Sequence, residues 1–126
     1  MIKFIIPQGI SDETKEFMND VIRELNEREV IESIDLGAMR MLATSYEMYK
    51  RATELLLRDG PVITDNFARV ANPAQTVATK NYAQVMKIMT EYGLTIKSRA
   101  HISSMNVDNS DSPLDNFFKD KQTEQR

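Results

Sequence analysis

Five basic side chains in the middle of the chain have the chemistry to neutralise phosphates. Four of them, Arg69, Lys80, Lys97 and Arg99, have no obvious acidic partner within a helix, and a fifth, Lys87, has Glu91 four residues on. Lys and Arg are the residues that neutralise the nucleic-acid backbone. The five residues therefore predict a DNA-binding surface, and a merely solvated basic face is the alternative for any one of them.

A second group of residues has the spacing of a docking motif. Leu114, Phe117 and Phe118 fall at i, i+3 and i+4, and Ser112-Pro113 precedes them as an N-cap and first helical residue. A short apolar helix in a polar tail is a common way for a flexible segment to enter a partner's groove. We therefore predict a partner-binding motif. The alternatives are that the two Phe residues fold back onto their own assembly or that the tail has no role.

Catalytic chemistry is poorly supported. The chain has no Cys and one His, which excludes disulfides, thiolate zinc sites and the usual nucleophilic triads within one chain. There is also no P-loop and no paired-carboxylate signature. The sequence predicts a protein that is not an enzyme and needs no metal or cofactor.

Composition is that of an ordinary globular protein, with 126 residues, 41% hydrophobic and 28% charged. No apolar run approaches the ~20 residues that span a bilayer, and the start of the chain does not resemble a secretory signal, which predicts an intracellular protein. The net charge is −3, with −4 in residues 1–32, +3 in residues 33–102 and −2 in residues 103–126. This balance argues against a strongly basic DNA-coating monomer but allows a local basic patch repeated in an oligomer.

The expected fold is all-α, because Gly and Pro are sparse and stand where helices should end. We expect a helical domain at 1–102, with an extended start at 2–6, and a disordered tail at 103–126 that carries the docking motif. The expected helices are 12–28, 36–58, 73–92 and 96–102, with an irregular connection or short strand at 60–71.

The helix expected at 36–58 has an unusually wide apolar arc. Its polar residues are confined to a narrow stripe, with Glu47–Arg51 and Glu54–Arg58 as expected surface ion pairs. Ala38, Ser45 and Ala52 are small enough to let another helix approach closely. An arc wider than the ~100° of an ordinary surface helix predicts burial against a second subunit. We therefore expect a cyclic homo-oligomer.

Three segments in fixed order carry a resemblance to a known family. They are an Asp-initiated helix closed by Gly at 35–60, Asn72-Pro73-Ala74 opening a helix, and the run Tyr92-Gly93-Leu94-Thr95-Ile96-Lys97-Ser98-Arg99-Ala100. Across residues 17–103 the chain resembles a widespread family of bacteriophage terminase small subunits, whose helical core ends in a Gly-Leu-Thr-Pro, Ser-Arg pattern. Ile96 stands where that family usually has Pro.

The resemblance implies a DNA-packaging factor in the cytoplasm of the infected bacterial host. Such subunits form rings, recognise the packaging site in viral double-stranded DNA, and recruit and regulate the large subunit, which carries the ATPase and nuclease. Family members often bind DNA through an N-terminal helix-turn-helix, whereas here the first expected helix is acidic and the helix-loop-helix at 12–58 is too long.

Two other functions fit the residues alone. A small helical transcription regulator would bind DNA as a dimer through a basic recognition helix, and the sequence shows none. An accessory or toxin-neutralising protein would act only through protein contacts. The absence of salt-dependent DNA binding would favour that second alternative.

Overall fold

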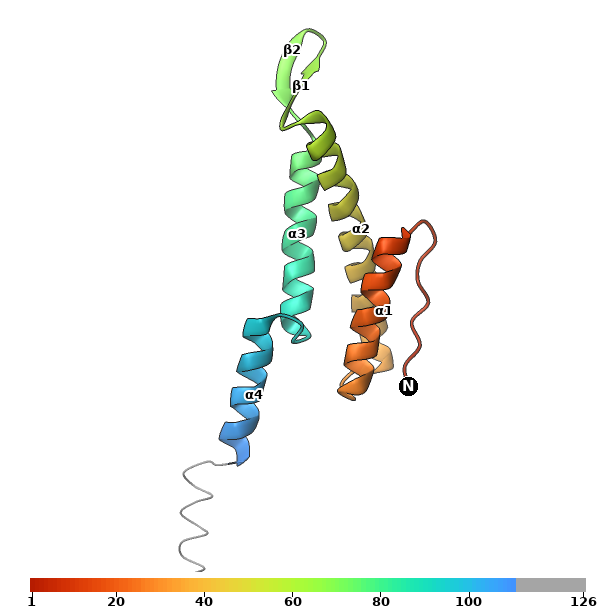
Figure 1. Ribbon diagram of the computed structural model, residues 1–126, viewed down its shortest axis with the longest axis vertical. Coiled ribbons are helices and arrows are strands. Elements are labelled where there is room, and N and C mark those ends of the chain that lie inside the picture. The colour runs from red at the N-terminus through yellow and green to blue at the C-terminus, as the bar shows by residue number, and fades with distance from the viewer. Residues whose placement is uncertain (111–126) are drawn as a thin grey trace, which may run out of the picture. The chain divides into compact units, whose positions relative to one another are not determined.

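The computed structural model describes residues 1–110, which form four helices, one short 3-10 turn and a two-stranded hairpin (Figure 1). In chain order the elements are α1 (Asp12–Glu27), η1 (Ser33–Asp35), α2 (Leu36–Asp59), β1 (Val62–Asp65), β2 (Ala68–Ala71), α3 (Ala74–Glu91) and α4 (Ile96–Ser110). The all-α prediction is confirmed, with the hairpin as an addition. The chain divides into two compact units, residues 1–88 and residues 89–126, which are described separately below.

In the first unit, α1 and α2 lie side by side and run in opposite directions (Figure 1). The apolar face expected on α1 is buried, with Met18 and Leu25 fully inaccessible. On α2 the fully buried apolar residues are Met39, Leu42 and Ala43. The ring of Phe17 stacks on that of Tyr46 with 4.1 Å between centroids, which fixes the register of the two helices.

The start of the chain is extended, as expected, and is tied to α1. The side-chain amide of Asn26 donates to the Ile2 carbonyl and accepts from the Ile2 amide, both at 3.0 Å. Side chains alternate between partly buried and exposed along residues 1–6. Because the pairing is with a side chain, this segment has strand-like alternation without belonging to a sheet among the described residues.

Residues 60–72 form a β-hairpin, where the sequence allows either an irregular connection or a short strand. The strands pair from Val62↔Ala71 to Asp65↔Ala68, which leaves Asn66 and Phe67 as a two-residue turn. Both turn residues have positive φ, 48° and 66°, as a type I′ turn requires. The base is closed by Asn72, whose backbone amide donates to the Pro61 carbonyl at 2.8 Å.

Asn72-Pro73 starts α3 as predicted, because the Asn72 side chain accepts the Ala74 amide at 3.1 Å. A small core joins α3 to α2 near the hairpin. It consists of Ala52, Ala74 and Ala78, with Tyr49 and Leu56 packed against it. Small side chains at this point allow the two helix backbones to approach closely.

In the second unit, the Gly-Leu-Thr-x-x-Ser segment performs the capping that its residue types predict. Gly93 has φ 67°, and the Leu94 amide donates to the Met89 carbonyl at 2.8 Å, which ends α3. Thr95 and Ser98 then exchange side-chain-to-backbone hydrogen bonds, each at 3.1 Å, at the start of α4. The predicted end of this helix at residue 102 is wrong, because α4 continues to Ser110.

Candidate functional site

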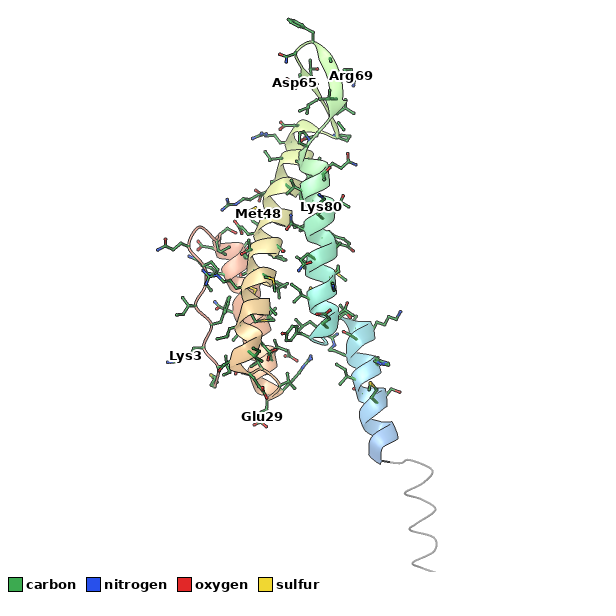
Figure 2. The ribbon with its side chains drawn as sticks, turned by 180° about the vertical axis from the view of Figure 1, so that it is seen from behind. Lys3, Glu29, Met48, Asp65, Arg69 and Lys80 are labelled. Carbon is green, nitrogen blue, oxygen red and sulfur yellow. The ribbon has the colours of Figure 1, made fainter. Side chains whose placement is uncertain are left out.

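All five sequence-predicted cations are exposed to solvent, and they come from three elements. Arg69 lies on β2 of the hairpin, and Lys80 and Lys87 lie on α3 in the first unit (Figure 2). Lys97 and Arg99 lie in the first turn of α4 in the second unit. Lys80 and Lys87 therefore share one face of α3, whereas Lys97 and Arg99, two positions apart, project from different faces of α4.

These five side chains, like Lys3 and Arg40, are free of salt bridges among the described residues. The cations that are paired are Lys15, Arg23, Arg28, Lys50, Arg51 and Arg58. An unpaired surface cation gives up no intramolecular partner when it meets a phosphate, so this group is the better suited to DNA.

On α3 the basic residues form one stripe. Lys80, Gln84 and Lys87 follow one another at i, i+4 and i+7, so they share one face of the helix. Gln84 also lines an open hollow of about 390 Å³ with α2, whose contributing residues are Gly37, Arg40, Met41, Thr44 and Ser45. Polar and cationic side chains from two helices therefore meet around Gln84.

Arg40 is a further candidate for DNA contact. It was not singled out from the sequence, because it lies in the polar stripe of α2. It is exposed, forms no salt bridge within residues 1–110, and borders the same hollow as Gln84. A signal is present in the sequence, since no acidic residue lies three or four positions to either side of Arg40. We add Arg40 to the candidate DNA-contacting residues.

The α4 cations differ in their surroundings. The Arg99 guanidinium donates to the Leu94 carbonyl at 3.4 Å, which ties it to the turn before α4. Lys97 has no such tie among the described residues, and the neighbouring His101 is exposed. Both cations remain accessible to an anionic partner.

An apolar stripe that remains partly exposed runs along α2, and at Met41 it borders the hollow shared with Gln84. Four exposed apolar residues repeat every seventh position, beginning in η1: Ile34 (85% exposed), Met41 (54%), Met48 (36%) and Leu55 (40%). A seven-residue repeat keeps these side chains on one line of the helix, as in the seam of a coiled coil. We call these four residues the α2 stripe. The wide apolar arc predicted for this helix is thus only partly covered by residues 1–88.

Glu47 occupies a different place from the one expected. The sequence predicts that it lies on a solvated stripe, but its side chain is 1% exposed. One carboxylate oxygen, Oε2, accepts the Ser11 hydroxyl at 2.8 Å and the Thr14 hydroxyl at 2.5 Å. The other, Oε1, accepts Arg51 Nε at 3.0 Å, and Arg51 Nη2 donates to the Gly9 carbonyl at 2.6 Å.

These contacts determine how Glu47 titrates. Burial alone raises the pKa of the carboxyl group, but hydrogen bonds from Thr14, Ser11 and Arg51 outweigh it and lower the pKa from 4.5 to about 2. The carboxylate is therefore charged at neutral pH and fully partnered. It joins the N-terminal turn, α1 and α2, which gives it a structural role.

The second predicted ion pair on α2, Glu54–Arg58, is wrong. Glu54 pairs instead with Lys50 at 2.9 Å, and Arg58 pairs with its neighbour Asp59 at 2.9 Å. The Glu47–Arg51 pair is confirmed at 3.0 Å, although in a buried setting.

The remaining predictions concern the tail motif, metal ligands and membrane-spanning helices. Leu114, Phe117 and Phe118 lie outside the described residues. Among the residues that are described, no three His, Asp or Glu side chains gather as metal ligands. None of the described helices combines the length and the apolar character that crossing a bilayer requires.

Taken together, these features define a helical protein that presents unpaired cations and an uncovered apolar helix face. A model of the family described as phage terminase, small subunit, matches residues 14–109. The chain therefore belongs to the phage terminase small subunit family, which gives it a general role in phage DNA packaging. Small subunits of this family are in general non-catalytic, since the ATPase resides in the large subunit. Comparisons with curated proteins and with solved structures gave no match.

Proposed function

We propose that this protein is the small subunit of a phage terminase that assembles as a cyclic homo-oligomer, binds viral double-stranded DNA, and recruits and regulates the large subunit. It acts in the cytoplasm of the infected bacterial host and uses no cofactor of its own. Family membership supports the packaging role. The unpaired cations support DNA binding, and they are the observation on which this part of the proposal depends.

Self-assembly is supported by the α2 stripe. Four apolar side chains in one line, uncovered within residues 1–88, form the kind of contiguous apolar surface that marks a protein interface. Assembly also helps to explain how an acidic chain can bind DNA. A ring repeats the few unpaired cations of one subunit many times along the duplex, so that weak phosphate contacts add up.

The DNA contact is assigned to Arg40, Arg69, Lys80, Lys87, Lys97 and Arg99. Two of these, Lys80 and Lys97, come from different units and retain no salt bridge among the described residues. The docking contact with the large subunit is assigned to Leu114, Phe117 and Phe118.

The test is charge reversal at two of these positions. Lys80→Glu combined with Lys97→Glu should weaken binding at least tenfold for all duplex sequences alike, because phosphate contacts carry no base information. The slope of log affinity against log salt should also become shallower. Fluorescence anisotropy at several salt concentrations measures both quantities.

Lys15→Glu is the matched control. It reverses one lysine that is already paired with Asp12 on the acidic α1, and it should leave DNA affinity within about twofold of the parent. A double variant that binds as tightly as the parent at low salt contradicts the assignment of these cations.

A further inference from the structure

The tip of the hairpin carries a fully exposed phenylalanine. Phe67 is 104% exposed and sits in a type I′ turn with φ 66°, a conformation in which glycine is the favoured residue. A bulky side chain there is disfavoured by the backbone, and in solvent its ring gains no burial in return. The ring thus has the position of a contact residue for another molecule.

The hairpin also lacks cover along its length. Val62 and Val70 are 46% and 38% exposed, and the whole of β2 is exposed. A two-stranded hairpin alone in water is marginally stable, and it needs a third strand or an apolar surface to pack against. The exposure of both the tip and the strands therefore favours contact with a partner molecule.

Charge favours protein over DNA as that partner. The strand and turn residues 62–71 contain one acidic and one basic side chain, Asp65 and Arg69, and so carry no net charge (Figure 2). Asp65 lies two residues from Phe67, where its carboxylate would meet phosphates at close range. Arms that wedge a side chain into the minor groove do so alongside cationic residues that offset the phosphates.

A matching pocket lies elsewhere on the first unit. Residues 1–4 and the second half of α1 border an open space of about 480 Å³. Its apolar lining residues are Met1, Ile2, Phe4 and Ile22, and its polar lining residues are Lys3, Asn19, Arg23, Asn26 and Glu27. Pockets of this size accept ligands larger than one phenyl ring. The hydrogen bonds between Asn26 and Ile2 hold the extended wall of the pocket in place.

The pocket cannot receive the tip of its own chain. Within residues 1–88 the hairpin extends from one end of the α2–α3 pair, whereas the N-terminal segment follows α1 toward the opposite end (Figure 1). Lys3 at the pocket and Asp65 at the tip are both exposed, and neither has a salt bridge with any described residue. They are complementary charges on surfaces that cannot meet within one chain.

We propose that the Phe67 tip of one copy inserts into the pocket between the N-terminal segment and α1 of the next copy, with Asp65 facing Lys3. The two surfaces differ, so the contact is heterologous and can close a ring. This inference rests on the self-assembly proposed above and adds a second contact to that of the α2 stripe.

Phe67→Gly is the first test, because glycine suits the turn and should leave the hairpin folded. Loss of the ring should raise the concentration for half-assembly at least tenfold, as for a buried aromatic anchor. Thr64→Ser, on the same hairpin, is the control and should assemble like the parent. Light scattering over a dilution series measures the mass.

A charge exchange tests the orientation of the contact. Lys3→Glu and Asp65→Lys should each weaken assembly, and the double variant should restore it because the opposite charges face each other again. Both positions are exposed, so neither change should unfold the chain. A double variant as weak as the sum of the single variants overturns the pairing of Asp65 with Lys3.

Cross-linking tests proximity directly, since the chain contains no cysteine. With a short bismaleimide, a chain carrying both Ala68→Cys and Asn19→Cys should form a ladder of covalent oligomers, because Ala68 is exposed beside Phe67 and the ring is retained. Each single variant should form no ladder. If the double variant assembles but gives no ladder, the inference is overturned.

Other outcomes separate this inference from the proposed function. If the parent assembles and Phe67→Gly assembles equally well, the inference fails and self-assembly stands. If the parent is a monomer throughout, self-assembly fails and the inference with it. If Phe67→Gly keeps its mass but loses DNA affinity, the tip contacts DNA and the inference is wrong.

Discussion

At Glu47 a charged group lies inside the α1–α2 pair and is stabilised by its hydrogen bonds. Two hydroxyl groups and one guanidinium satisfy its two oxygens, so the cost of burial is offset while the carboxylate remains ionised. Removing the charge leaves these donors with a weaker acceptor, which makes Glu47 a point of acid sensitivity in the fold.

The pKa of Glu47 is lowered in the folded protein, from 4.5 to about 2. A group whose pKa falls on folding contributes stability above its unfolded pKa and loses that contribution as pH falls through its folded pKa. We therefore expect the free energy of unfolding to decrease between about pH 4.5 and pH 2. Urea denaturation at fixed protein concentration, repeated across this range, measures the decrease.

Glu47→Gln is the variant that isolates this effect. It should destabilise the protein at pH 7 by about 2 kcal/mol and flatten the pH dependence below pH 4.5, since the titrating group is gone. Glu54→Gln is the control: its side chain is 60% exposed and its pair with Lys50 lies at the surface, so the change should be within about 0.5 kcal/mol. A Glu47→Gln protein with the parent's acid profile would show that other carboxylates cause the loss.

The burial of Glu47 could not be predicted from its position in the sequence. Glu47 falls on the same helical stripe as Arg51 and Arg58, and that periodicity predicts a solvated position. Its burial depends on Ser11 and Thr14, which are more than 30 residues away and whose hydroxyl groups face α2 only once α1 has packed. Arg40 was overlooked for a different reason: it lies in the polar stripe of α2, although the sequence offers it no acidic partner three or four positions away.

Among the elements, α2 has one apolar side that is buried and another that is exposed. One side is buried against its own chain, while the α2 stripe is exposed. The sequence predicted the width of the apolar arc correctly, because helical periodicity reports how many sides of a helix avoid water. Periodicity does not identify what would cover the exposed side, because it carries no information about a partner.

Charges in the α2 stripe should prevent assembly. Met41→Glu combined with Met48→Glu should give a folded protein whose mass by light scattering falls to that of the 14.5 kDa monomer. Helical circular dichroism should be retained, because both side chains are partly exposed. Met39→Glu, at a fully buried neighbouring position, should instead unfold the chain. An oligomer that persists in the double variant excludes this stripe from the interface.

Helix ends were predicted correctly where the sequence contains a capping motif. Asn72-Pro73 and Gly93-Leu94 act locally, so their residue types were sufficient. The hairpin could not be predicted with the same certainty, because its turn has Phe67 where a glycine is usual and the common Asn-Gly signal is absent. The end of α4 was predicted too early because Ser and Asn usually favour a helix end, yet this helix continues to Ser110.

For the whole molecule, we propose a division of labour between two parts of the chain. The helical part assembles and binds DNA, and the residues after Ser110 dock the large subunit. The truncation that tests this division belongs after Ser110, since an earlier cut would remove part of α4.

Deleting residues 111–126 should leave the mass of the assembly and its DNA affinity unchanged while abolishing stimulation of the large-subunit ATPase. Replacing Leu114, Phe117 and Phe118 together by Ser should reproduce that loss with the tail length retained. Normal stimulation by the deleted protein would remove the docking role. A failure to assemble would show that the tail folds back onto its own ring.

The hydrogen bonds at Glu47 also bear on the order in which the chain folds. They join Ser11 and Thr14 to Glu47, so all three partners lie in the part of the chain that ends with α2. This contact can therefore form before the hairpin and α3 have been synthesised. We expect the first two helices to pair during synthesis, before the hairpin leaves the ribosome, and a fragment of residues 1–59 to show protected amides in hydrogen exchange. New subunits would then carry a finished pocket before they carry the tip that fills a neighbour's, which delays self-association until more than half of the chain has been synthesised.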